Sequence, residues 1–360
     1  MQTKAGLELG VTENAPLAPL TTLGIGGPAR YFAHVGREEQ IPELLAWAEE
    51  RAMPVLVLGG GSNLLVADRG FDGLVLFMAN RGSMESPEGA VTIAAGETWD
   101  EFVAVCVERN WAGVECLSGI PGTVGGTPVQ NVGAYGQEVA ETILMVRAWD
   151  RQSRRFAVLD RTACRFGYRT SVFNRHEPGR YIVTAVHFGL RPGGAPALRY
   201  AELARQFGGV AKPTLAAVRA AVREIRRGKA MLIAPGEAEC RSAGSFFKNP
   251  IVSAAEAEQI ARRAGAAPPS FSTPEGTKLA AAWLIEQAGF RRGYRPAGTD
   301  GAPGRVGLSS RHALAIINHG GATAAEVVAL ERRIRDAVEA KFGVRLTPEP
   351  VFVGFDANEE

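Results

Sequence analysis

The sequence has few cysteines and histidines, and neither residue type is spaced as a metal site or a redox motif. The four cysteines lie at positions 106, 116, 164 and 240 without a CxxC pair, and the five histidines form no HxxxH or HExxH pattern. Zinc sites and dithiol redox centres depend on such spacings. We therefore expect no structural metal, and reduced thiols favour the cytoplasm.

Long apolar runs and a strong excess of charge are also lacking. The longest uncharged stretch, residues 116–137, is broken by repeated glycine and proline and cannot span a bilayer as a helix. The first residues lack the apolar core of a signal peptide. A net charge of +2 gives no general attraction to nucleic acid or acidic membranes. The sequence thus predicts a cytoplasmic protein with neither kind of partner.

One basic run, Arg223–Lys229, is present but has no aromatic residues interleaved to stack bases. It is interpreted either as a helix end near one anionic group or as a solvated face, and the solvated face is favoured.

The length and composition predict a folded protein of two or three domains. The chain has 360 residues, of which 46% are hydrophobic and 22% charged. Residues 1–20 are expected to be a loose arm. Apolar periodicity and capping patterns predict helices near 38–51, from Thr98 (with Glu101 completing a capping box) to about 113, from Thr214, and at about 253–264, 277–288 and 323–342. Strands are expected at 55–58, 64–66, 74–77, 91–95, 142–149, 155–159, 181–190 and 313–317, with a last apolar strand near the C-terminus.

The first chemical signal is a glycine-rich turn after the strand at 55–58. Its residues are Gly59, Gly60, Gly61, Ser62 and Asn63. Successive glycines expose backbone N–H groups that can surround a phosphate. The turn is not a Rossmann fingerprint, because Leu64 stands at the sixth position and no crossover helix follows. A diphosphate held between strands and a plain hairpin-like loop both remain open from this motif alone.

The second signal is the long loop from Ser118 to Gly136. It is rich in glycine and hydroxyl groups, carries no charge, and is stiffened by Pro121 and Pro128. Long loops inside a compact domain are commonly functional. The backbone of this one could lie against a large flat ligand.

Three further residues stand in unusual settings. Arg169 follows Gly167 and Tyr168, which suits it either to clamp a carboxylate or phosphate or to pack on an aromatic ring. Ser245 lies in a small-residue turn directly before two phenylalanines, and a buried turn serine bonded to its own backbone is the simpler interpretation. Glu349 is enclosed by two prolines at the head of an apolar strand.

Six stretches, in this order, resemble the UDP-N-acetylenolpyruvoylglucosamine reductase (MurB) family, flavoenzymes of peptidoglycan precursor synthesis. The resemblance runs from about residue 18 to 356. The stretches are Leu58–Asn63, Ser118–Gly136, Phe166–Phe173, Ala243–Pro250, Leu284–Gln287 and Pro348–Glu349.

The resemblance implies an α+β fold with a PCMH-like, non-Rossmann, two-lobed FAD-binding domain and a C-terminal α/β substrate-binding domain. The implied divisions are a first FAD-binding lobe (18–80), a second lobe (81–225) with a tyrosine loop near 191–205, the substrate-binding domain (226–345), and a C-terminal strand returning to the active site (346–360). The implied enzyme is a monomer with non-covalent FAD and with NADPH as hydride donor. It would reduce UDP-N-acetylglucosamine enolpyruvate to UDP-N-acetylmuramate.

The resemblance also implies residue roles. Ser245 is implied as the proton donor, and Arg169 and Glu349 as groups that polarise the substrate carboxylate. The implied substrate contacts are Tyr135, Tyr200, Lys229, Asn249 and Gln287. The implied FAD contacts are Gly59, Gly60, Gly61, Ser62, Asn63, Ser118, Gly119, Ile120, Pro121, Gly122, Gly125, Gly126, Gln130, Asn131, Gly133 and Ala134.

Two other functions share part of this pattern. A PCMH-type flavin oxidase of a sugar or alcohol would have the two glycine-rich stretches, but it gives no reason for Arg169, Tyr200, Ser245 and Glu349 to occur together. A non-catalytic binder of nucleotide sugars would show no bound flavin.

Overall fold

The computed structural model describes residues 9–85, 89–234, 236–237, 239–298 and 301–356. The chain divides into two compact units whose segments alternate along the sequence. Unit 1 consists of residues 1–15, 29–60 and 72–227, and unit 2 of residues 16–28, 61–71 and 228–360. The change from one unit to the other falls inside the glycine-rich turn, between Gly60 and Gly61.

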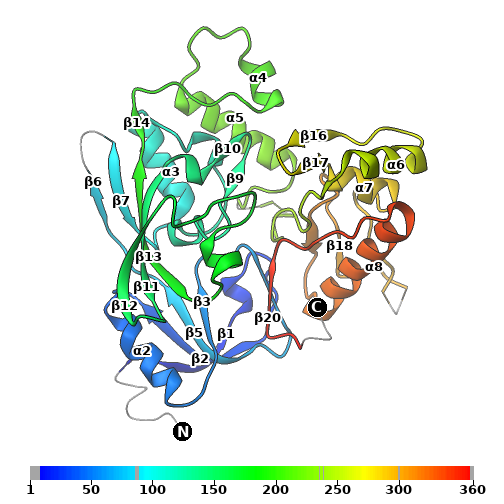
Figure 1. Ribbon diagram of the computed structural model, residues 1–360. Coiled ribbons are helices and arrows are strands. Elements are labelled where there is room, and N and C mark those ends of the chain that lie inside the picture. The colour runs from blue at the N-terminus through cyan, green and yellow to red at the C-terminus, as the bar shows by residue number, and fades with distance from the viewer. Residues whose placement is uncertain (1–8, 86–88, 235, 238, 299–300, 357–360) are drawn as a thin grey trace. The chain divides into compact units, whose positions relative to one another are not determined.

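Unit 1 contains two sheets with helices packed against them (Figure 1). The first sheet has the order β1 (Thr12–Pro16), β2 (Pro28–Val35), β5 (Phe71–Met78) and β3 (Val55–Leu58), with β3 and β5 parallel. The second is antiparallel, in the order β12 (Arg155–Asp160), β11 (Ile143–Asp150), β13 (Tyr181–Gly189), β7 (Ala90–Ala94) and β6 (Ser83–Glu85). One core extends through this unit and includes the buried faces of α2 (Gln40–Glu49) and α3 (Trp99–Glu108).

The rest of unit 1 is short elements and two further helices. The short pair β8 (Trp111–Ala112) and β14 (Arg191–Pro192) is antiparallel, as is the pair β9 (Gly133–Ala134) and β10 (Gln137–Glu138). Helices α4 (Ala201–Phe207) and α5 (Leu215–Gly228) share a small core of their own with Cys116. These elements surround the long loop at 118–136.

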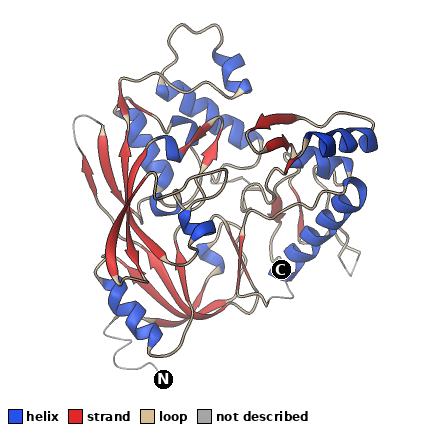
Figure 2. Ribbon diagram, in the orientation of Figure 1, coloured by secondary structure: helices blue, strands red, loops and turns tan. Residues whose placement is uncertain are grey.

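Unit 2 is a smaller α/β assembly (Figure 2). It has a three-stranded sheet, β15 (Ile251–Val252), β17 (Gly276–Leu279) and β16 (Ser270–Thr273), and a pair, β18 (Val306–Leu308) and β19 (Ile316–Asn318). A parallel pair joins β4 (Leu64–Val66) to β20 (Val351–Val353). Helices α6 (Ala254–Ala264), α7 (Ala281–Gln287) and α8 (Ala324–Phe342) pack on a common core. Segments almost 290 residues apart in sequence are therefore neighbours.

Most of the expected elements are confirmed, and five expectations are wrong. The helix expected to run to about 113 ends at Glu108, and Trp111 and Ala112 form β8 instead. Residues 12–16, expected in a loose arm, form β1, because they pair with β2. The helix expected at 277–288 begins only at Ala281, because residues 277–279 belong to β17 and pair with strands on both sides. The strand expected at 313–317 begins only at Ile316. Thr98 is the N-cap of α3, but its side chain makes no capping bond; instead the first helical N–H, at Trp99, donates to the carbonyl of Gly122.

Candidate active site

The two glycine-rich stretches meet in unit 1 at positions where a side chain could not fit. A Cβ atom on Gly60 would lie 2.5 Å from the Cα of Gly122, and one on Gly59 would lie 2.7 Å from Oγ1 of Thr123. Real Cβ contacts are longer, so glycine at these positions lets the two backbones touch. Gly125 approaches Ala95 in the same way, at 2.5 Å. The two glycine-rich stretches are thus packed backbone against backbone.

The long loop is held in shape by buried hydrogen bonds at both ends. Ser118 donates its hydroxyl to the carbonyl of Glu115 at 2.6 Å. Asn131, only 1% exposed, donates to the carboxylate of Glu138 and to the carbonyl of Gly167. The loop is thus a fixed wall rather than a mobile linker. The other predicted FAD contacts in this unit are on the same loop, at Ile120, Pro121, Gly126, Gln130, Gly133 and Ala134.

Arg169 lies at the tip of a tight turn, with its backbone in the left-handed region at φ 54°. Gly167 and Thr170 exchange two backbone hydrogen bonds across this turn. The guanidinium donates to the carbonyl of Gly133 at 2.8 Å and lies 5.7 Å from the ring centre of Tyr168. The structure therefore shows the cation–π packing that was one of the two expectations, and it also directs the cation to the long loop. A left-handed non-glycine residue costs about 1–3 kcal/mol, and such strain is concentrated at functional sites.

Tyr135 and Tyr200, predicted as substrate contacts, are neighbours in unit 1. Their rings meet edge to face with centroids 5.2 Å apart. Tyr135 is also left-handed, at φ 51°, and Tyr200 is the N-cap of α4. Arg199 anchors the loop by an ion pair with Glu141. The structure thus brings the two tyrosines together although 65 positions separate them.

In unit 2, residues of the first glycine-rich turn lie against the backbone of Glu349. The side-chain amide of Asn63 donates to the backbone carbonyl of Glu349 at 3.1 Å. The Val351 N–H donates to the backbone carbonyl of Asn63 at 2.9 Å. Thr22 donates its hydroxyl to the carbonyl of Ser242 at 2.6 Å and its N–H to that of Gly61. Ser62 lies between these two anchored positions.

The residues directly after Ser245 pair with the segment that carries Glu349 in unit 2. The Glu349 N–H donates to the Phe246 carbonyl at 2.8 Å, and Phe247 pairs with Pro348. Phe246 and Phe247 are buried, whereas Ser245 is only partly covered. Lys248 continues this pairing, since its N–H donates to the Thr347 carbonyl at 2.9 Å. The phenyl rings fix the turn in the core of unit 2 and leave the serine at its edge.

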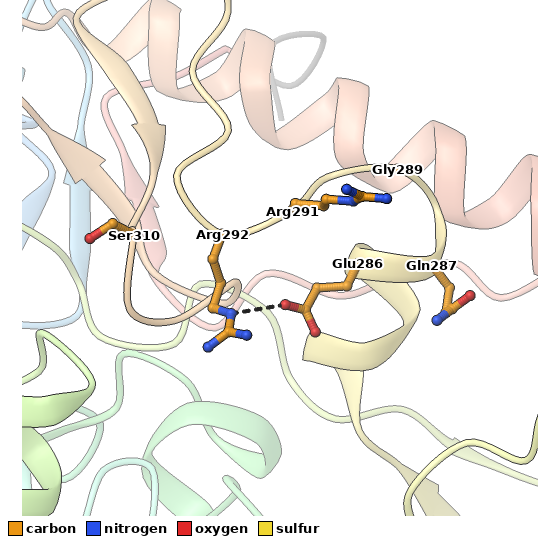
Figure 3. A pocket seen from close by; sticks show the side chains of 6 residues that line it. All are labelled: Glu286, Gln287, Gly289, Arg291, Arg292 and Ser310. Carbon is orange, nitrogen blue, oxygen red and sulfur yellow. Dashed lines mark hydrogen bonds and ion pairs between the residues drawn. The ribbon is translucent and has the colours of Figure 1, made fainter.

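The remaining predicted substrate contacts are also in unit 2. Asn249 accepts from the N–H of Ala281 at 2.9 Å, so it caps the start of α7. At the other end of α7, Gln287 lines a pocket of about 640 Å³ together with Arg291, Arg292 and Ser310 (Figure 3). In Figure 3 an ion pair joins Arg292 to Glu286 on one side of this pocket.

Lys229 and Arg292 are both close enough to His312 for their charges to affect it. Burial lowers the pKa of His312 to about 4, and the charges of Lys229 and Arg292 add to this effect. The ring nitrogen Nδ1 of His312 accepts from the Leu314 N–H at 3.1 Å, as a neutral imidazole can. These groups form a region of unit 2 that is suited to an anionic ligand.

Three structural contributors were not predicted from the sequence. Asp100 accepts from the Gly119 N–H at 2.6 Å, His312 is partly buried near the cations, and Thr22 ties two segments of unit 2 together. The basic run is also not simply solvated, because Arg226 is only 7% exposed and Arg223 pairs with Asp100. The sequence showed Asp100 as an acidic residue in the first turn of α3. It could not show the partner Arg223, which lies on α5 more than 100 positions later.

The two packed glycine-rich stretches fit FAD. Their exposed groups are mainly backbone, and the long loop carries no acidic side chain that would repel a diphosphate. Residues 29–156 match a family model described as an FAD binding domain. The chain is therefore a flavoprotein, an FAD-dependent oxidoreductase.

The comparisons also give the particular family. Residues 235–353 match the UDP-N-acetylenolpyruvoylglucosamine reductase C-terminal domain. The chain is 45% identical over 356 residues to the UDP-N-acetylenolpyruvoylglucosamine reductase of Thermobifida fusca, covering 95% of this chain and 97% of that one. It is 47% identical over 350 residues to the reductase of the same name from Mycolicibacterium gilvum, covering 96% of each. The chain belongs to the UDP-N-acetylenolpyruvoylglucosamine reductase family.

A solved structure supports the fold. The crystal structure of the reductase (MurB) from Thermus caldophilus is similar with a TM-score of 0.65 and 28% identity, covering 95% of this chain and 98% of that one. The α+β fold, with a PCMH-like FAD-binding domain and a C-terminal substrate-binding domain, is confirmed. No helix within the described ranges is long and apolar enough to cross a membrane.

Proposed function

We propose that this chain is a cytoplasmic, monomeric enzyme that reduces the enolpyruvyl group of UDP-N-acetylglucosamine enolpyruvate to give UDP-N-acetylmuramate, with NADPH as the reductant. The observation that carries the proposal is that the residues directly after Ser245 pair with the segment that carries Glu349 in unit 2, through the Glu349 N–H and the Phe246 carbonyl. It supports a proton donor and a carboxyl group on neighbouring segments. Bound FAD supplies the hydride that it receives from NADPH.

Hydride addition to one alkene carbon leaves negative charge on the other, delocalised into the substrate carboxylate. Arg169 stabilises that developing charge, and its fixed position supports this role, because its guanidinium is already held by the Gly133 carbonyl and the Tyr168 ring. By analogy with single oxyanion donors, one such group contributes about 3 kcal/mol to transition-state stabilisation.

Ser245 then donates its hydroxyl proton to the carbanion, and the proton is recovered from solvent. Serine is a weak acid in water, but a carbanion is a strong base, so correct placement is the main requirement. Proton transfer from a positioned group typically accelerates a reaction by about 10²- to 10⁴-fold. Glu349, on the adjacent segment, polarises the substrate carboxylate.

Tyr200 covers the substrate, and Tyr135 and Asn249 contact it. Lys229 and Gln287 bind the nucleotide part. The support for these two residues is the cationic neighbourhood of Lys229 and Arg292 and the pocket that Gln287 lines, both of which suit a diphosphate.

The direct test is to mix the purified protein with NADPH and UDP-N-acetylglucosamine enolpyruvate and to follow NADPH loss by its absorbance. We expect stoichiometric oxidation of NADPH and formation of UDP-N-acetylmuramate. Oxidation that depends on oxygen and ignores the enolpyruvyl substrate would instead identify an oxidase.

The variant Ser245→Ala separates the two half-reactions. NADPH is expected to bleach its flavin at the normal rate, while turnover of the enolpyruvyl substrate falls by about 10²-fold or more. Ser272→Ala, on the exposed face of β16, is the matched control and is expected to turn over normally. Normal product formation by Ser245→Ala would refute the role of Ser245 as proton donor.

A further inference from the structure

One residue of the long loop, Gly119, is held at both its backbone N–H and its backbone carbonyl by charged side chains. The N–H of Gly119 donates to Oδ1 of Asp100 at 2.6 Å, and the carbonyl of Gly119 accepts from Nε of Arg226 at 2.9 Å. Gly119 is left-handed, at φ 72°. Both charged residues belong to unit 1, one from the first turn of α3 and the other from the last turn of α5.

Asp100 is itself held by α5. Arg219 donates to both of its carboxylate oxygens, and Arg223 donates to one of them at 2.5 Å. Burial alone raises the pKa of Asp100, but the hydrogen bonds from Arg219 and the Gly119 N–H outweigh burial and keep the pKa below its ordinary value. The carboxylate thus stays ionised, and three arginines of one helix hold Gly119, Arg226 directly and Arg219 and Arg223 through Asp100.

Arg226 is the member of this group that is costly to bury. It is 7% exposed, and removing a cation from water is unfavourable unless hydrogen bonds compensate. Burial lowers the pKa of its guanidinium, and a hydrogen bond with the Tyr135 side chain opposes that effect. Arg226 therefore joins the beginning of the long loop, at Gly119, to its end, at Tyr135.

We propose that Arg226 is a positioning residue for FAD, fixing the Gly119 peptide and the Tyr135 side chain so that the loop at 118–136 keeps the shape that binds the cofactor. The proposal rests on the FAD contacts proposed for this loop. The basic run Arg223–Lys229 thereby gains a structural role, which is neither nucleic-acid binding nor simple solvation.

The bidentate shape of the guanidinium is what the role requires. Its donors leave a planar group in fixed directions, so one side chain can serve the Gly119 carbonyl and the Tyr135 oxygen together. A lysine at this position keeps the charge but presents one compact donor group. Methionine fills a similar volume without charge or donor, and it avoids the cost of burying a cation.

The test compares Arg226→Met and Arg226→Lys with Arg227→Met as the matched control. Arg227 lies one position further along α5, is exposed, and forms an ion pair with Glu224. Deflavinated protein is titrated with FAD, and the dissociation constant is measured from the quenching of flavin fluorescence. We expect at least a tenfold rise for Arg226→Met, a smaller rise for Arg226→Lys, and a change of less than twofold for Arg227→Met.

Thermal unfolding with and without FAD distinguishes positioning from simple stabilisation. Stabilisation by a ligand depends on its dissociation constant, so the rise in Tm that FAD produces should shrink in Arg226→Met. A folded Arg226→Met protein with an unchanged dissociation constant, or with an undiminished FAD-induced rise in Tm, overturns the proposal. If Arg226→Met does not fold, the same two measurements on Arg226→Lys, the FAD dissociation constant and the FAD-induced rise in Tm, test the proposal.

Failure of this inference is distinguishable from failure of the proposed function. Wild-type protein that takes up FAD but does not oxidise NADPH with the enolpyruvyl substrate contradicts the function and leaves the role of Arg226 testable. Equal FAD binding by wild type and both Arg226 variants contradicts only the role of Arg226.

Discussion

His312 gives a quantitative prediction of how stability depends on pH. In the folded chain, burial and the charges of Lys229 and Arg292 lower its pKa to about 4, from an ordinary value of 6.5. Below pH 6.5 the unfolded chain binds a proton at this residue that the folded chain does not bind. The free energy of unfolding therefore falls as the pH is lowered from 6.5 towards 4, and His312 has no such effect at higher pH.

The magnitude follows from these two pKa values. With one pKa unit equal to about 1.4 kcal/mol, His312 destabilises the fold by roughly 0.8 kcal/mol at pH 6, roughly 2 kcal/mol at pH 5 and roughly 3 kcal/mol at pH 4. Carboxyl groups titrate in the same range, so the effect must be read as a difference between two proteins. We expect His312→Gln to gain stability relative to wild type by these amounts as the pH falls.

The assay is urea unfolding from pH 7.5 to pH 4.5 for wild type, His312→Gln and the control His176→Gln, whose side chain is exposed in unit 1. An NMR titration of the histidine ring protons gives the pKa directly, and His312→Gln assigns the resonance. Lys229→Met should raise the pKa of His312 but leave it below 6.5, because burial is the larger cause. The reasoning is refuted if His312 titrates near 6.5, or if the difference between wild type and His312→Gln does not change with pH.

Two further predictions concern other parts of the molecule. Arg169→Ala should keep its yellow flavin but lose about 10²- to 10³-fold in turnover, because an electrostatic donor is removed while the loop at 118–136 is kept. An absorbance spectrum without flavin would mean that Arg169 serves the cofactor or the fold instead. Asp68→Ala should lower the free energy of unfolding of unit 2 by about 1–2 kcal/mol, because the Asp68 carboxylate accepts from the N–H groups of Ala324 and Ala325 at the start of α8. Asp72→Ala, which removes an exposed ion pair with Arg30, is the control for Asp68 and should have little effect in the same denaturant titration.

Local patterns in the sequence were enough to predict elements whose stability is also local. The capping boxes at Ser253 and Thr323 are confirmed, because a cap needs only a partner three residues away. The buried stripe of Trp99, Phe102, Val103 and Cys106 is confirmed for the same reason. The helix expected at 277–288 is present but begins only at Ala281, because residues 276–279 pair with β15 and β16, and no local pattern reveals such partners.

The candidate site shows the same division. Composition and spacing were sufficient to single out Arg169, Ser245 and Glu349, which remain predictions as to role. Sequence could not show that Asp100 and Arg226 bond the N–H and the carbonyl of the same residue, because they are 126 positions apart and each is ordinary for its helix. Nor could it show that Asn249 caps α7, since the true start of that helix depends on the neighbouring strand.

The alternation of the two units along the chain has a consequence for the order in which the protein can fold during synthesis. Residues 16–28 and 61–71 leave the ribosome early, but their partners in unit 2 begin only at residue 228. Strand β4 must wait for β20, almost 290 residues later, and Leu23, Ile25 and Leu65 stay without their core until then. Closing such long loops is slow, and apolar segments left waiting are exposed to aggregation. Unit 1 has all its segments once residue 227 has emerged, so the early unit 2 segments extend from a folded neighbour as tethered loops, and chaperone binding is expected to concentrate on them.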